Sequence, residues 1–222
     1  GTPDANAYRR YMKMLYDRAK ADSDMPKSLL LFGDCLWDNR MNTPVAQNLN
    51  PDNYLLCFES ENSFNEIYSY VDDGWFTLLD DGEGLDPKAV DKQDIGVGRF
   101  PVSSPEEAKI LVDKCINYAK NANAGDWQNA IMFMGDDGNN NIHMSDINDT
   151  AELIASLYPG YQIKKAMWDA YKRQTTSVGN TYPEARALIM QQQAEGALIM
   201  DYAGHGAPAQ ISHEAVLRLT DL

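Results

Sequence analysis

The stretch "GALIMDYAGHG", residues 196–206, is the most informative part of the sequence for the fold. A short apolar run ends there in a histidine between two glycines, which is typical of a strand buried in a parallel sheet. The stretch "NAIMFMGDDG", residues 129–138, has the same design and ends in two acids, Asp136 and Asp137. Because parallel strands bring their carboxyl ends to one edge of a sheet, we expect Asp137 and His205 to face one another.

Strand-like and helix-like segments alternate along the rest of the chain. Further strands are expected at 27–34, 54–58, 94–102 and 161–169, and helices at 7–21, 103–121, 145–159, 182–196 and 211–222. This order predicts an α/β fold with mostly parallel sheets and helices on both faces. The stretch "NANAGD", residues 121–126, has the composition of a linker. We therefore expect two adjoining subdomains, residues 1–122 and 123–222.

The charge balance excludes some classes of partner. The chain has 33 acidic and 19 basic residues, a net charge of −14. Such a chain repels nucleic acid and anionic membranes, so neither is expected as a partner. No apolar run approaches the ~20 residues of a membrane-spanning helix, so no membrane span is expected.

The three cysteines do not form a disulfide framework. Cys115 falls on the apolar stripe of the helix expected at 103–121, which indicates a core position. For Cys35 and Cys57 two alternatives stay open: a disulfide, if the protein is exported, or buried thiols, which we favour. None of the three is expected to be a reactive nucleophile.

His205 is the strongest candidate for chemistry. Its flanking glycines allow a sharp turn and close approach of a substrate, and a carboxylate that orients an imidazole is the usual partner of an activated nucleophile. A structural histidine beside a solvated acidic turn is the alternative. His143 and His213 lack a comparable position after a strand.

No metal-binding motif is present, and no catalytic cofactor is expected. The segments "DDGEGLD" (80–86) and "DDGNNN" (136–141) offer oxygen ligands for a structural calcium ion. Neither has the spacing of an EF-hand, so a solvated loop is favoured over a calcium site.

Several blocks, taken in order, resemble the gingipain family of cysteine peptidases, and within it the sortases of the type IX secretion system of Bacteroidetes. The blocks are "LLLFGDCLWDNR" (29–40), "YVDDGWFTLLDD" (70–81), "GRFPVSSPEEAKILVDKCINY" (98–118), "WQNAIMFMGDDG" (127–138), "GALIMDYAGHG" (196–206) and "ISHEAVLRLTDL" (211–222). The resemblance implies a caspase-like α/β/α fold in two subdomains and a Cys-His mechanism. It implies His205 as the catalytic histidine, Asp137 as the acid with Asp136 as second choice, and the Gly206 backbone N–H in an oxyanion hole.

In the family the nucleophilic cysteine follows the next strand after the histidine block, a position that no cysteine of this chain matches. We therefore expect the nucleophile beyond Leu222, and residues 1–222 alone to be inactive. The resemblance implies an endopeptidase or transpeptidase, exported to the cell surface, with protein or peptide substrates and secretion-system components as partners. The alternative is a non-catalytic binding or scaffold module of a surface secretion assembly.

Overall fold

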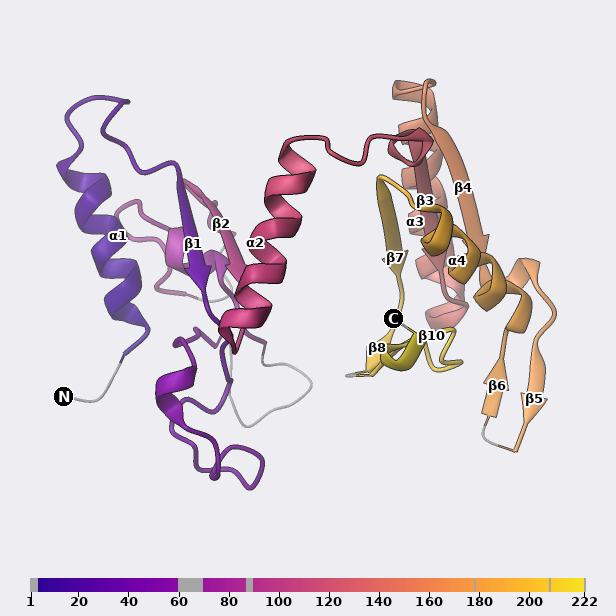
Figure 1. Ribbon diagram of the computed structural model, residues 1–222, viewed down its shortest axis with the longest axis horizontal. Helices are drawn as coiled ribbons and strands as arrows, with labels where there is room; N and C mark the ends of the chain where they lie inside the picture. The colour runs from indigo at the N-terminus through magenta and orange to yellow at the C-terminus, as the bar shows by residue number, and fades with distance from the viewer. Residues whose placement is uncertain (1–3, 60–69, 87–89, 178, 208, 222) are drawn as a thin grey trace. The chain divides into compact units, whose positions relative to one another are not determined.

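The computed structural model describes residues 4–59, 70–86, 90–177, 179–207 and 209–221. Its contacts divide the chain into two compact units, Gly1–Lys120 and Asn121–Leu222 (Figure 1). The boundary lies at the start of the Asn-, Ala- and Gly-rich stretch 121–126.

The first unit is built on two parallel strands. Its elements are α1 (Asn6–Arg18), β1 (Ser28–Phe32), the 3-10 turns η1 (Pro51–Asn53) and η2 (Gly74–Thr77), β2 (Gly96–Phe100) and α2 (Pro105–Ala119). The helix α1 packs against η2, and Leu31 of β1 lies in a buried cluster with Trp75 and Phe76. The continuous apolar run of β1 is typical of a strand buried on both faces, but β1 is covered on one face only. Leu30 and Phe32 are 50% and 47% exposed, because only the opposite face of β1 is covered.

The helix α2 begins as its sequence predicts. The Ser104 hydroxyl accepts the Glu107 N–H at 3.2 Å, and the Glu107 carboxylate accepts the Ser103 N–H at 2.7 Å. None of its residues is buried among the described parts of the chain, however, and Cys115 is exposed. The prediction of a core position for Cys115 is therefore wrong. An apolar stripe shows which side chains share a helix face, not whether another element covers that face.

The second unit contains a three-stranded parallel sheet in the order β4-β3-β7. Its strands are β3 (Ala130–Gly135), β4 (Gln162–Met167) and β7 (Ile199–Ala203). Met132 of β3 is paired with Met200 of β7, and Gly135 with Ala203. The two apolar runs that end in the acidic pair and in Gly-His-Gly thus lie side by side and parallel, which confirms the sequence prediction.

Helices cover both faces of this sheet. Because side chains alternate along a strand, Ile131 and Phe133 of β3 pack with α3 (Gly138–Leu157) on one face. Met132 and Met134 pack with α4 (Pro183–Glu195) on the other. All six residues of β3 are buried. The predicted α/β/α layering is therefore confirmed in this unit.

The remaining elements of the second unit are short. They are η3 (Asp126–Asn129), η4 (Trp168–Ala170), the hairpin of β5 (Gln174–Thr176) and β6 (Gly179–Thr181), the antiparallel strands β8 (Gly206–Ala207), β9 (Gln210–Ile211) and β10 (Leu217–Arg218), and η5 (Leu219–Asp221).

The helix expected at 211–222 is wrong, since β9, β10 and η5 occupy this segment. Ser212 and Ala215 have positive φ values of 56° and 48°, which a right-handed helix excludes. The Ser212 N–H donates to the His205 carbonyl at 2.7 Å instead. The strand expected at 54–58 is reduced to one isolated bridge, which pairs Leu55 with Cys35.

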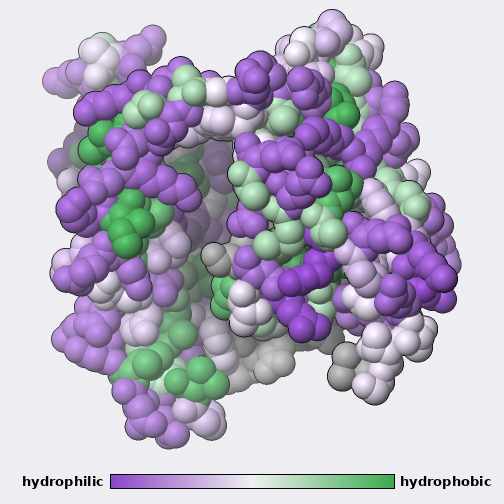
Figure 2. Space-filling model, turned by 45° about the vertical axis from the view of Figure 1, so that its right-hand side comes forward, coloured by the Kyte–Doolittle hydropathy of each residue, from purple (hydrophilic) through white to green (hydrophobic). Residues whose placement is uncertain are grey.

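The face shown in Figure 2 is mostly hydrophilic, with scattered apolar patches. In the part of the chain that the structure describes, no helix combines the length and the apolar composition needed to cross a membrane.

Candidate active site

The carboxyl ends of β3 and β7 form one edge of the sheet in the second unit. Asp136 and Asp137 follow β3, and Gly204, His205 and Gly206 follow β7. The strand pairing therefore brings the predicted site residues to one place, and the exposed side chain of His205 is accessible there.

The carboxylate of Asp136 is the centre of this edge. Asp136 is only 2% exposed and accepts four hydrogen bonds. The donors are Nδ1 of His143 (2.5 Å), the His205 N–H (2.7 Å), the Tyr202 hydroxyl (2.9 Å) and the Gly138 N–H (3.0 Å). Burial alone would raise the pKa of Asp136, but these hydrogen bonds outweigh it and lower the pKa below its usual value. Asp136 is therefore held as a buried carboxylate.

Asp137 points to a different partner. Its Oδ2 accepts the Tyr182 hydroxyl at 2.6 Å, at the start of α4. Burial and this hydrogen bond raise the pKa of Tyr182 to about 12. In the described chain neither Asp136 nor Asp137 forms a hydrogen bond with the imidazole ring of His205. The role of each acid in orienting that ring stays a prediction.

The imidazole of His205 lies against the segment that follows the two acids. Its Nε2 is 3.3 Å from Oδ1 of Asn139. Asn139, Asn140 and Asn141 all have positive φ values, 51°, 57° and 66°, so the chain turns there before α3 continues. Asparagine tolerates this conformation better than other non-glycine residues. The asparagine-rich turn thus places an amide beside the ring.

The three histidines of the chain converge at this edge. The ring centroids of His143 and His205 are 5.0 Å apart, and those of His205 and His213 are 5.8 Å apart, both with edge-on geometry. Sequence reasoning gave His143 and His213 no role. The signal for His143 was its place near the start of the helix after β3, which keeps it near the end of the strand. The irregular segment 210–221 places His213 beside His205, whereas the sequence predicts a helix at 211–222.

The two glycines beside His205 are in different environments. A Cβ at Gly204 would lie 2.2 Å from the Tyr202 hydroxyl and 2.4 Å from Oδ2 of Asp136. A Cβ at Gly206 would meet nothing closer than the Gln210 carbonyl, at 3.8 Å. Close packing around Asp136 therefore requires a glycine at 204 but not at 206. Gly206 is paired with Ile211 in the β8–β9 ladder.

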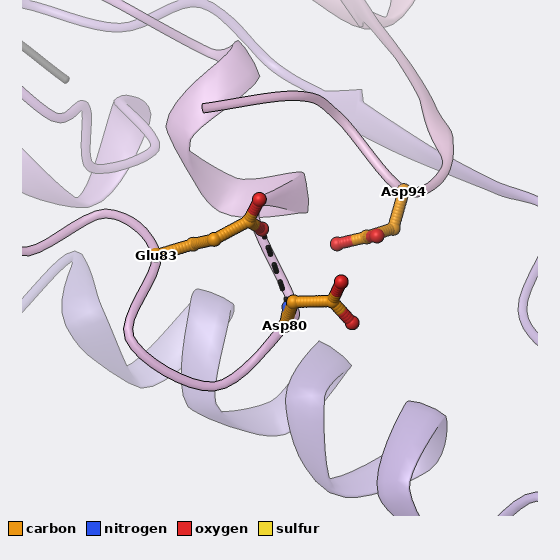
Figure 3. A group of neighbouring side chains, drawn as sticks. All are labelled: Asp80, Glu83 and Asp94. Atoms are coloured by element: carbon orange, nitrogen blue, oxygen red, sulfur yellow. Dashed lines mark hydrogen bonds between the residues drawn. The ribbon is translucent and has the colours of Figure 1, made fainter. Parts of the chain in front are cut away.

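A separate acidic group lies in the first unit. Asp80, Glu83 and Asp94 place carboxylate oxygens within 4.8 Å of one another (Figure 3). Oxygens of this group already accept backbone N–H groups, that of Leu79 at 2.6 Å and that of Asp80 at 3.3 Å. These bonds give the acids a structural role. The solvated loops that we favour over calcium sites at 80–86 and 136–141 stay a prediction. In the second segment both oxygens of Asp136 accept hydrogen bonds.

All three cysteines belong to the first unit, and residues 121–222 contain none. The unit that carries His205 therefore has no thiol of its own.

Comparisons with known proteins agree with the resemblance in sequence. Residues 1–222 match the model of peptidase family C25. Among solved structures, the chain is similar to dimeric latent PorU from Porphyromonas gingivalis, with 37% identity over 57% of this chain and 12% of that chain, and a TM-score of 0.40. The match thus spans about an eighth of the PorU chain. None of the curated proteins searched matches the chain. Because the family match extends over the whole sequence, the chain belongs to peptidase family C25, the gingipain family of cysteine peptidases.

Proposed function

We propose that this chain carries the catalytic histidine of a gingipain-like cysteine endopeptidase or transpeptidase. The observation that supports this most directly is the exposed His205 at the end of β7, with its backbone tied to the buried Asp136 at the end of β3. A general base needs an accessible imidazole and a fixed backbone, and this strand edge supplies both.

In the proposed reaction a cysteine thiol gives its proton to the His205 imidazole, and the sulfur attacks the carbonyl carbon of the scissile peptide bond. The C–N bond breaks, the imidazolium returns the proton to the leaving amine, and a thioester remains. Water or an amine then displaces the sulfur, which regenerates the thiol. The N–H of Gly206 is a candidate donor to the oxyanion, and Asp137 or Asp136 orients the imidazole.

The nucleophilic cysteine is proposed to lie in sequence outside residues 1–222. This proposal rests on the absence of cysteine from residues 121–222 and on the absence of histidine from residues 1–120, which contain all three cysteines. The substrates are proposed to be exported or cell-surface proteins, and the partners components of a secretion system. Family membership supports protein substrates, and the resemblance to type IX sortases supports the location.

The test compares variants of the full-length protein on a peptide library under reducing conditions. His205→Ala is expected to lower kcat/KM by about 10³-fold or more. Asp137→Asn and Asp136→Asn are expected to lower it less. His213→Ala is the matched histidine control, since its ring lies beside His205 but has no proposed proton-transfer role. The control is expected to retain most activity.

Near-normal turnover by a folded His205→Ala protein would refute the assignment. A full-length protein that folds, binds peptides and cleaves or joins none of them would favour the binding module instead.

A further inference from the structure

Two cysteines that the sequence does not predict to be reactive lie in the first unit, at the ends of an irregular segment, residues 36–56. Cys35 precedes this segment, three residues after the end of β1, and Cys57 follows it. The two ends are held together by backbone pairing. Cys35 forms a parallel bridge with Leu55, and the Leu55 N–H donates to the Asp34 carbonyl at 2.8 Å.

The two thiols are neighbours but differ in access. Cys57 is 2% exposed, and its Sγ–H donates to the Leu36 carbonyl at 3.3 Å. Cys35 is half-buried, and the Leu36 carbonyl that accepts the Cys57 Sγ–H belongs to the residue directly after it. One thiol of the pair can therefore be reached from solvent, while the other is enclosed behind it.

The surroundings of the pair favour ionisation of the outer thiol. The interaction with Cys57, and then the guanidinium of Arg99, lower the pKa of Cys35, although burial and the carboxylates of Asp73 and Asp34 act in the opposite direction. Arg99 is fixed by two hydrogen bonds to Asp73, at 2.7 and 2.8 Å, and by one to the Gly33 carbonyl, at 2.9 Å. The interaction with Cys35 and burial raise the pKa of Cys57. Cys35 is thus the thiol suited to attack, and Cys57 the thiol suited to act second.

From this geometry we propose that Cys35 and Cys57 are a redox-active pair that closes to a disulfide by exchange with a small-molecule disulfide, such as oxidised glutathione. The Cys35 thiolate attacks one sulfur of the small disulfide, which forms a mixed disulfide and releases one thiolate. The Cys57 sulfur then attacks Sγ of Cys35, loses its proton to solvent and releases the second thiolate. Two protein thiols are oxidised and one small disulfide is reduced to two thiols, so the exchange balances.

The disulfide would fix the ends of the segment that forms a cavity. Residues 36–56 supply most of the lining of a cavity of about 670 Å³, including Leu36, Asn39, Leu49 and Tyr54. The pair lies in the first unit, and residues 1–120 contain no histidine. Its proposed chemistry is thiol–disulfide exchange, which needs no imidazole.

The direct test needs no variant. The chain is incubated with oxidised glutathione at pH 8, the remaining thiols are blocked with N-ethylmaleimide, and the digest is analysed by mass spectrometry. A peptide pair linked through Cys35 and Cys57 is expected, with Cys115 outside it. Separate blocking of Cys35 and Cys57 after full exposure to oxidant would overturn the proposal, as would linkage of either to Cys115.

Variants test the order of attack. Cys57→Ser is expected to trap glutathione on Cys35, and Cys35→Ser to slow the modification of Cys57 by at least about tenfold, because the remaining thiol is enclosed and less ionised. The matched control Cys115→Ser is expected to form the disulfide as the unchanged chain does. Faster glutathionylation of Cys57 than of Cys35 would overturn the assigned roles.

Discussion

The carboxylate of Asp136 accepts the backbone N–H of His205 at 2.7 Å, so a side chain at the end of β3 holds the main chain at the end of β7. The contact is to the backbone of the histidine and not to its ring. It fixes where the histidine stands on the sheet edge, while the ring rests against Asn139. The hydrogen bond that positions the backbone of His205 is thus distinct from the contact of its ring with Asn139.

The two glycines beside His205 are expected to respond differently to alanine. Gly204→Ala forces a methyl group against the Tyr202 hydroxyl and Asp136, and is expected to lower the free energy of unfolding by about 1–3 kcal/mol. Gly206→Ala places its methyl group at an ordinary contact distance of 3.8 Å from the Gln210 carbonyl and is expected to change the free energy of unfolding by less than about 0.5 kcal/mol. Urea unfolding followed by tryptophan fluorescence measures both. Equal losses in the two variants would contradict the assigned packing.

The adjacent acids Asp136 and Asp137 are expected to differ in their contribution to stability. Asp136→Asn replaces an acceptor oxygen by an NH₂ group among four donors, which is expected to cost about 1–3 kcal/mol in the free energy of unfolding. Asp137→Asn affects one hydrogen bond, to Tyr182, and is expected to cost about 1 kcal/mol or less. The measurement is chemical unfolding at pH 7. A larger loss of stability in Asp137→Asn than in Asp136→Asn would show that Asp137, and not Asp136, is the carboxylate held by several donors.

Stability is expected to fall in acid, and Asp221 is expected to account for part of the fall. Hydrogen bonds from Arg186 and from the Arg218 N–H lower the pKa of Asp221 to about 2. An unfolded aspartate has a pKa of about 3.9, so the folded chain binds fewer protons and stability rises with pH. The contribution is complete above about pH 4 and is lost as the pH falls toward 2.

The Asp221→Asn variant should therefore be less stable than the unchanged chain at pH 6, and its stability should fall less between pH 6 and pH 2.5. Melting temperatures measured across this pH range test both expectations. Arg186→Ala serves as the partner variant, since it removes the same ion pair from the other side. If the melting temperature of both variants falls with pH as steeply as that of the unchanged chain, Asp221 does not account for the loss of stability in acid.

The 222-residue chain itself is expected to fold without cleaving peptides. Nucleophilic catalysis needs a thiolate beside the imidazole, and without it His205 can only assist water, so catalysis is small. A longer chain that includes the proposed cysteine should cleave or transpeptidate the same peptides, and iodoacetamide should abolish this. Strong cleavage by residues 1–222 would show that the nucleophile is among Cys35, Cys57 and Cys115.

The sequence predicts the framework of the fold well. The runs at β3 and β7 are apolar apart from Asp201 and are bounded by turn residues, so their type and parallel pairing could be predicted. The start of α2 could be predicted from Ser104 and Pro105. Segment 211–222 could not, because its apolar spacing suits a helix while Ser212 and Ala215 adopt positive φ values in tertiary contacts.

The site is predicted less fully than the sheet that carries it. The strand pattern brings Asp136, Asp137 and His205 to one edge, but it cannot tell which of two adjacent acids points inward. In the structure Asp136 is turned toward the backbone of His205, and Asp137 is turned toward Tyr182. The approach of His143 and His213 depends on the asparagine turn and on the irregular segment 210–221, which periodicity does not describe.

Because β3 is completely buried, the exchange of its amide hydrogens with deuterium provides a reference for the amides at the site. The Asp136 N–H donates to the Ala203 carbonyl at 3.3 Å, which links the ends of β3 and β7. The amides of β3 should exchange only when the second unit opens as a whole, because β4 and β7 flank the strand and α3 and α4 cover it. The Asp136 amide lies at the margin of this protected block. Its exchange rate, relative to that of Phe133, would report how often the sheet edge opens beside His205 while the core stays closed.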